Sequence, residues 1–199
     1  MSVLGWSCSR LTDGESTPAP VTTDPGGAPA IDPGEHAVYA AVLAQKYPAP
    51  GYVIHDATRA DAFPGPLADT VALVLQQMHD VAMQTSASFI ARNAQSQRLG
   101  PEMSLGAPYV LVTDLELQQL FTSTSEAGVE AGWQAFYARY PDAHGLITLS
   151  RVGFNAGGDQ ALVYVGNQYG GLGGEGVYFL LSRVGDAWLV DQQALTWIS

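Results

Sequence analysis

The C-terminal third of the chain constrains the fold most. Four segments rich in β-branched and aromatic residues follow one another there, and such residues favour strands: "GLITLSRVGFN", "QALVYVGNQ", "GVYFLLSRV" and "AWLVDQQALTWIS". The short sequences "AGGD" and "GD" separate members of this series and predict tight hairpin turns. The end of the chain is therefore predicted to be an antiparallel meander.

Helical patterns dominate the preceding part of the chain. Thr113 is a candidate N-cap, and Glu116 three positions later completes a predicted capping box. A break near Thr85–Ser88 is predicted to divide one long helical region, with a second helix in "ASFIARNAQ". Residues 34–47, 66–100, 114–121 and 127–140 are predicted helical, and 52–58 and 107–112 are predicted strands.

Because helices come first and the sheet last, the predicted class is α+β. We expect helices packed on one face of a curved antiparallel sheet of about four to six strands, as in nuclear-transport-factor-like or cystatin-like folds.

The N-terminal stretch has a different composition. Residues 9–33 are rich in Pro, Thr, Gly and Asp and have almost no large apolar side chains, which predicts disorder. We therefore expect a leader or tether over 1–33 and one globular domain over 34–199. "SVLGWSC" resembles a bacterial lipoprotein cleavage site, which would make Cys8 a lipid-attachment residue; the alternative is a leader with an incidental cysteine.

Charge excludes several function classes. The formal net charge is −11, and Lys46 is the one lysine, so the chain should repel nucleic acid and anionic lipid surfaces. Apolar runs fall short of the roughly 20 residues of a bilayer-spanning helix. With Cys8 as the single cysteine, neither an internal disulfide nor a cysteine-based metal cluster can form.

A G-x-G-x-x-G pattern falls at Gly171, Gly173 and Gly176. Phosphate binding by this motif requires a helix that begins at the glycines, whereas here "VYFLL" predicts a strand. The kinase type of glycine loop requires a later lysine and a catalytic loop, which this sequence does not provide. We predict no nucleotide or other cofactor, and a wide hairpin loop whose glycines take positive φ.

The ionisable residues give no established catalytic pattern. His36, His55, His79 and His144 lack zinc-binding spacing, so no metal is predicted. His55 beside Asp56 is either an oriented base or a structural histidine. Ser150 has no evident base, and spacing alone does not unite the carboxylates Glu175, Asp191 and Asp159. We assign no catalytic residue and expect a protein that is not an enzyme.

Aromatic residues along the sheet have two interpretations. They are either core and cross-strand packing or, in part, a platform for a sugar. The residues concerned are Trp133, Phe154, Tyr164, Tyr178, Phe179, Trp188 and Trp197.

The segment "LSRVGFN…QALVYVGNQ" and the glycine loop after it resemble the C-terminal region of a family of bacterial proteins without an established activity. "VYAAVLAQKY", "YVIHDAT", "FIARN" and "YVLVTDLELQQLF" extend the resemblance over about residues 35–199. Many members of that family are exported and some are lipoproteins. Two loop positions that hold cysteines in many relatives hold Tyr169 and Gly173 here, so the resemblance implies no redox or metal role for this loop.

The resemblance supports export and directs attention to residues 150–178. The candidate residues for binding a ligand or partner there are Arg151, Asn155, Asn167, Gln168, Tyr169 and Glu175. We expect a non-catalytic protein of the bacterial envelope, or a secreted one, that binds a partner or small ligand through this face. The alternatives are a cytoplasmic protein, and a small-molecule enzyme with a pocket between sheet and helices that uses His55, Asp56 or Arg151.

Arg151 interrupts an apolar strand, and its guanidinium needs an anion. With Asn155 paired to Gln160, counting back predicts Arg151 opposite Tyr164, with Phe179 near. Its anion is either an internal carboxylate, such as Glu175 or Asp191, or an acidic group of a ligand or partner.

Overall fold

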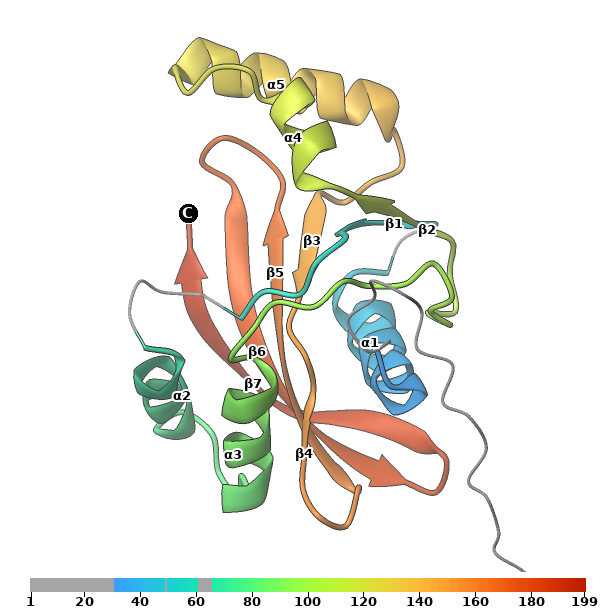
Figure 1. The fold of residues 1–199 in the computed structure, drawn as a ribbon, viewed down its shortest axis with the longest axis vertical. Helices are drawn as coiled ribbons and strands as arrows, with labels where there is room; N and C mark the ends of the chain where they lie inside the picture. Colours follow the sequence, from blue (N-terminus) through green and yellow to red (C-terminus); the bar gives the residue numbers. More distant parts are fainter. Residues whose placement is uncertain (1–30, 49, 61–65) are drawn as a thin grey trace, which may run out of the picture.

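The computed structural model describes residues 31–48, 50–60 and 66–199 (Figure 1). Five helices and seven strands lie within these ranges. In chain order they are α1 (Pro33–Lys46), β1 (Tyr52–His55), α2 (Leu67–Leu75), α3 (Met83–Arg92), β2 (Tyr109–Val112), α4 (Asp114–Leu120), α5 (Glu126–Arg139), β3 (Leu146–Leu149), β4 (Gly153–Phe154), β5 (Gln160–Gln168), β6 (Gly174–Val184) and β7 (Ala187–Ile198).

All seven strands form one mixed, curved sheet. Its order is β2-β1-β3-β5-β6-β7, and β4 pairs with β5 beside this path. The β5–β6–β7 pairs are antiparallel, which confirms the predicted α+β class and C-terminal meander. β1 pairs in parallel with both β2 and β3, so the sheet is not antiparallel throughout. Helical segments connect these parallel strands, as parallel pairing requires.

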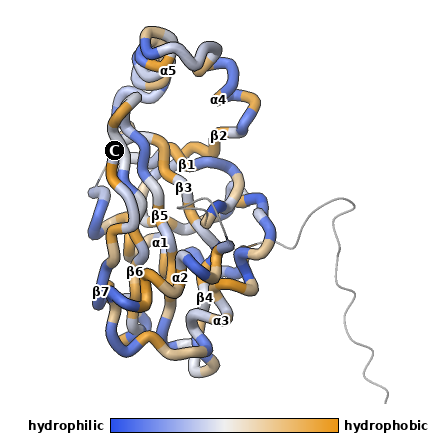
Figure 2. The backbone as a smooth tube through the Cα atoms, turned by 90° about the vertical axis from the view of Figure 1, so that its left-hand side faces the viewer, coloured by the Kyte–Doolittle hydropathy of each residue, from blue (hydrophilic) through white to orange (hydrophobic). Residues whose placement is uncertain are grey.

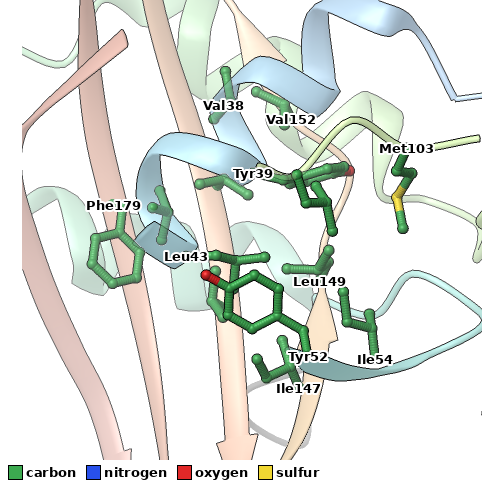
Figure 3. Close-up of a cluster of buried hydrophobic side chains, with 14 of the residues drawn as sticks. Val38, Tyr39, Leu43, Tyr52, Ile54, Met103, Ile147, Leu149, Val152 and Phe179 are labelled. Atoms are coloured by element: carbon green, nitrogen blue, oxygen red, sulfur yellow. The ribbon is translucent and has the colours of Figure 1, made fainter. Parts of the chain in front are cut away.

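α1 covers one face of the sheet. Its buried side chains, including Val38, Tyr39 and Leu43, contact inward-facing residues of β3, β5 and β6, such as Leu149 and Phe179 (Figure 3). This largest apolar cluster also takes in Ile31, so the packed part of the chain begins before the predicted boundary at Gly34. The remainder of the predicted leader, with Cys8, lies outside the described residues.

The opposite face carries the other helices in two groups. α2 and α3 pack through Val71, Val74 and Phe89 onto the alternate residues of β5 and β6. α5 packs through Trp133 and Phe136 against Val53 and Leu146, and α4 adds Leu117 and Leu120 to this cluster. The two groups lie at opposite ends of the molecule (Figures 1 and 2). Helices therefore cover both faces rather than the single face predicted, and the middle of this second face lies between the two helix groups.

Turn and cap chemistry agrees with the sequence at several places. Gly158 and Gly185 take φ values of 67° and 62° in the two predicted hairpin turns. Thr113 and Glu116 form the predicted capping box at the start of α4. The loop glycines differ from the prediction: no positive φ is found for the described glycines between 170 and 176. For Gly174 and Gly176 the physical reason is the close approach of Trp197, described below.

The helix break is also displaced. α2 ends at Leu75 and α3 begins at Met83, so Thr85 lies within the helix where a break was predicted. The Thr85 hydroxyl donates to the Gln160 side chain at 2.8 Å, and the N–H of Ala82 donates to the same oxygen. This glutamine thus satisfies groups at the start of α3, and β5 determines where the helix begins.

Candidate functional site

An open hollow of about 400 Å³ lies on the second face of the sheet. Its described lining comes from β3, β5, β7 and the segment after β1: Arg59, Thr148, Tyr164, Gly166, Gln168, Trp197 and Ser199. We call it the sheet hollow. Its volume lies within the range of small-molecule sites, and Arg59 is its one charged side chain among the described lining residues.

Gly166 lines the sheet hollow, and two glycines of the neighbouring strand lie beneath its indole. Gly166 of β5 pairs with Gly176 of β6. A Cβ on Gly176 would overlap the Trp197 indole, and one on Gly174 would lie 2.8 Å from the same ring. The indole therefore lies against bare backbone on one side. Glycine in a strand weakens the strand, and its place here is explained by this close approach.

A β-bulge places Trp197 on this face. Trp197 pairs with Gly176 and Leu195 pairs with Val177, so Thr196 is the extra residue on β7. In a regular strand Trp197 and Ala194, three positions apart, would point to opposite faces of the sheet. The extra residue places both side chains on the same face. The Thr196 hydroxyl donates to the Gly176 carbonyl at 2.9 Å, which holds the bulge in place.

Tyr164 fixes the edge of the indole. Trp197 Nε1 donates to the Tyr164 hydroxyl at 2.9 Å. The Tyr164 ring packs on Tyr178, with centroids 5.1 Å apart, and Tyr178 packs on Phe89 of α3 at 5.5 Å. Buried aromatic contacts thus hold the wall of the sheet hollow rigid, as a preformed binding site requires.

An ion pair lies at the rim of the hollow. Arg59 Nη2 donates to Asp114 Oδ1 at 2.7 Å, and Asp114 begins α4. His55 is buried below them, with its Nε2 2.9 Å from the same oxygen. His55 Nδ1 lies 3.0 Å from the Ala57 carbonyl and 3.1 Å from the Ala57 N–H, so that nitrogen faces the backbone while Nε2 faces the Asp114 carboxylate. The hydrogen bond from His55 and the charge of Arg59 lower the pKa of Asp114.

These contacts distinguish the two interpretations of His55. One ring nitrogen contacts the Ala57 backbone and the other binds a carboxylate, while the side chain is only 2% exposed. Asp56 is equally engaged, because it forms an ion pair with Arg98. Both residues hold the segment after β1 in place. These contacts favour the interpretation of His55 as a structural histidine.

A second hollow of about 460 Å³ adjoins the first. Arg59 lines both. We call it the side hollow; its described lining is mostly small and polar: Ala57, Thr58, Arg59, Ala60, Leu67, Thr70, Asn93, Ala94, Gln95, Ser96 and Asp114.

The predicted candidate Arg151 lies on the opposite side of the sheet, bound within the fold. Its Nε and Nη2 donate to the Glu35 carboxylate of α1 at 2.7–3.1 Å. Arg92 donates to the same carboxylate, and Glu35 is completely buried. Arg151 therefore has an internal carboxylate, but it is Glu35 and neither Glu175 nor Asp191. An open guanidinium for a ligand's acidic group is contradicted by this pairing.

The predicted register of Arg151 is wrong by one residue. The Asn155 N–H bonds to the Gln160 carbonyl as expected, but Ser150, not Arg151, lies opposite Tyr164. The strand is interrupted between β3 and β4, where the N–H groups of Arg151 and Val152 donate to the side chains of Asn93 and Glu35. These side chains replace strand partners, so the chain accommodates an extra residue there.

Three other candidate residues also serve the fold on the α1 side or at its turns. Glu175 binds Lys46 at 3.1 Å and the Tyr47 hydroxyl at 3.0 Å. Asn167 is buried and donates to the His144 carbonyl at 3.2 Å. Asn155 accepts backbone hydrogen bonds inside the β4–β5 turn.

The remaining candidates lie nearer the hollow. The Tyr169 carbonyl accepts from the Tyr137 hydroxyl of α5 at 3.0 Å, which fastens the glycine loop to that helix. Gln168 alone among the six candidates lines the sheet hollow. The carboxylates of Glu175, Asp159 and Asp191 have different partners, namely Lys46, Asn155 and Ser182, and do not form a pair.

Sequence reasoning assigned no binding role to Arg59, Thr148 or Gly166. Gly166 carried a usable signal, because glycine inside an otherwise apolar strand marks close approach of another group. Arg59 carried none, since its place follows from the path of the chain after β1.

Comparison of the chain with protein-family models, curated proteins and solved structures finds no match. The resemblance to an exported bacterial family stays a prediction. Across the described residues, no helix combines the length and apolar character of a membrane span. In the same part of the chain, His, Cys, Asp and Glu side chains do not gather in threes as a metal ion would require.

Proposed function

We propose that this protein binds a small ligand without catalysing a reaction, and that the ligand lies in the sheet hollow. The observation that carries the proposal is the placement of Trp197. A bulge turns the indole into the hollow, and strand glycines leave the space it occupies. Strand glycines and an edge-strand bulge each weaken a sheet, so their coincidence at a hollow supports a binding role.

The chemistry of the lining supports binding rather than catalysis. Arg59 is ion-paired, and both nitrogens of His55 are engaged. The Glu35 carboxylate lies away from the hollow and has five hydrogen-bond donors. Asp114 is the carboxylate at the rim of the sheet hollow, and its contacts with His55 and Arg59, which lower its pKa, make it a weak general base.

The proposal includes a location at the bacterial cell envelope or outside the cell. Its support is the sequence around Cys8, outside the described residues, and the family resemblance. Strong negative charge argues against a nucleic-acid partner.

The test is a small-molecule screen by thermal shift, followed by titration of each hit against variants. Gln168→Ala removes an exposed amide from the hollow, and Gln118→Ala removes a comparable exposed amide from α4 as the matched control. We expect hits on the wild type to weaken about tenfold in Gln168→Ala and to keep their affinity in Gln118→Ala. Hits that bind both variants equally would contradict a site in the sheet hollow.

A further inference from the structure

The charges around the sheet hollow compensate one another. Arg59 and Asp114 are joined at 2.7 Å, with side chains 45% and 63% exposed, so the pair presents both donors and a carboxylate acceptor to solvent. The whole chain carries a net charge of −11, which disfavours an anionic ligand. A cationic ligand would have to compete with Arg59 for Asp114. An uncharged ligand fits these conditions best.

The indole supplies a flat apolar surface. One side of Trp197 lies on Gly174 and Gly176, and its half-buried ring lines the hollow. The face of an aromatic ring is electron-rich and attracts the weakly positive hydrogens of C–H groups. A pyranose ring presents several axial C–H groups on one face, so it stacks on such a surface.

The polar groups around the indole suit hydroxyls. The Thr148 hydroxyl and the Gln168 amide each donate and accept, Arg59 donates, and Asp114 accepts. They come from β3, β5, the segment after β1 and α4, so they approach a ligand from several directions. A ring that carries hydroxyls around its whole edge can bond to all of them, whereas a nucleobase has polar atoms at only part of its edge.

The two adjoining hollows suggest a ligand longer than one ring. Arg59 lines both the sheet hollow and the side hollow, and the side hollow adds Thr58, Thr70 and Gln95. We infer that the site takes an uncharged oligosaccharide, with one ring stacked on Trp197 and the next ring beyond Arg59. This inference rests on the proposed function and names the class of its ligand.

The test compares defined sugars by calorimetric titration: glucose, N-acetylglucosamine, maltotriose and N,N′,N″-triacetylchitotriose, with trigalacturonic acid as an anionic probe and adenosine as a nucleoside. We expect at least one neutral trisaccharide to bind about tenfold more tightly than its monosaccharide. Trp197→Phe should keep most of this affinity, and Trp197→Ala should lose about tenfold. Gln168→Ala, at an exposed position, repeats the test without risk to folding.

The outcomes separate the two proposals. One outcome is that no neutral sugar binds, while adenosine or another screening hit binds the wild type and is weakened by Gln168→Ala. This result would overturn the saccharide as the ligand class and keep the sheet hollow as a binding site. Preference for trigalacturonic acid would also overturn the uncharged ligand. Equal affinity for a trisaccharide and its monosaccharide would overturn the extension past Arg59. Failure of every probe and every screening hit would overturn the proposed function itself.

Discussion

A carboxylate buried as completely as Glu35 persists only with full compensation, because its desolvation is costly. Arg151 and Arg92 supply charge, and the Val152 N–H and the Tyr39 hydroxyl supply two further hydrogen bonds. Burial raises the pKa of Tyr39, which keeps its proton available for donation. Glu35 thereby ties α1 to α3 and to the interrupted strand between β3 and β4.

Replacement of Glu35 by Gln should lower the free energy of unfolding by about 3 kcal/mol, because two arginines lose their anion in a buried site. Arg151→Met should cost a similar amount by leaving the carboxylate underpaired. Urea unfolding measures both changes. Glu102→Gln, at an exposed position, is the control and should stay within about 0.5 kcal/mol of the wild type. A Glu35→Gln protein as stable as that control would contradict the structural role.

Stability should also depend on pH through Glu35. Burial alone would raise its pKa, but hydrogen bonds from Arg151 and Val152 and the charges of Arg151 and Arg92 outweigh burial, so the pKa lies below its ordinary value of 4.5. A depressed pKa means that the contribution is complete above 4.5 and disappears as the pH falls through the folded-state value. Unfolding curves between about pH 6 and pH 3 should show this loss, and Glu35→Gln should flatten it. An unchanged slope in that variant would assign the acid sensitivity to other carboxylates, among them Asp114.

The sequence predicted that Arg151 needs an anion, but it did not identify the residue that supplies this anion. Arg151 and Glu35 are 116 positions apart, and their meeting depends on how α1 docks on the sheet. The register also depended on side chains elsewhere, since Asn93 and Glu35 replace strand partners at Arg151 and Val152. Local patterns carry no information about such long-range hydrogen bonds.

At the scale of elements, β7 shows how an edge strand serves two purposes. Its two register shifts are opposite Gly176–Val177 and Leu180–Leu181. The first turns Trp197 into the sheet hollow. The second allows Gln192 to bond to the backbone of His79 between α2 and α3. Bulges also make an edge strand a poor template for pairing with another chain. The two bulges of β7 therefore protect this edge from such pairing and also redirect its side chains.

Gly176→Ala should displace the Trp197 ring, because the added methyl group would overlap the indole. The expected result is a red-shifted tryptophan emission and loss of the Trp197–Tyr164 hydrogen bond, with destabilisation of about 1–3 kcal/mol from overpacking. Gly100→Ala is the control, since no atom lies within 4 Å of its added carbon. An unchanged emission spectrum in Gly176→Ala would mean that the indole does not rest on this glycine.

Elements with local signals were predictable from the sequence. The capping box at Thr113, the hairpin turns at Gly158 and Gly185, and the meander itself are confirmed. The start of α3 and the parallel pairing of β1 were not predictable, because β5 and the crossover helices determine them. The sheet hollow was not predictable either, because the bulge and the glycines opposite it can be recognised only once the pairing of the strands is known.

For the whole molecule, the distribution of helices creates the site. α1 closes one face of the sheet, while α2–α3 and α4–α5 hold the two ends of the other. The fold class followed from the order of patterns along the sequence, but the coverage of both faces did not. One sequence signal did indicate a sheet with helices on both faces: β5 has apolar residues pointing to both faces over Ala161–Val165.

Salt should stabilise the whole molecule. A net charge of −11 opposes compaction, and raising NaCl from about 10 mM to about 150 mM shortens the screening length from about 30 Å to about 8 Å. The melting temperature should therefore rise by a few degrees at neutral pH.

The exposed ion pairs Arg139–Glu116 and Arg183–Asp186 should lose little stability in salt, because such pairs contribute little. The buried Glu35 cluster is shielded from the salt. Near the isoelectric point, about 4.4, the same salt step should have almost no effect, since the repulsion of the net charge is gone. A melting temperature that falls with salt at neutral pH would mean that surface ion pairs outweigh the repulsion of the net charge.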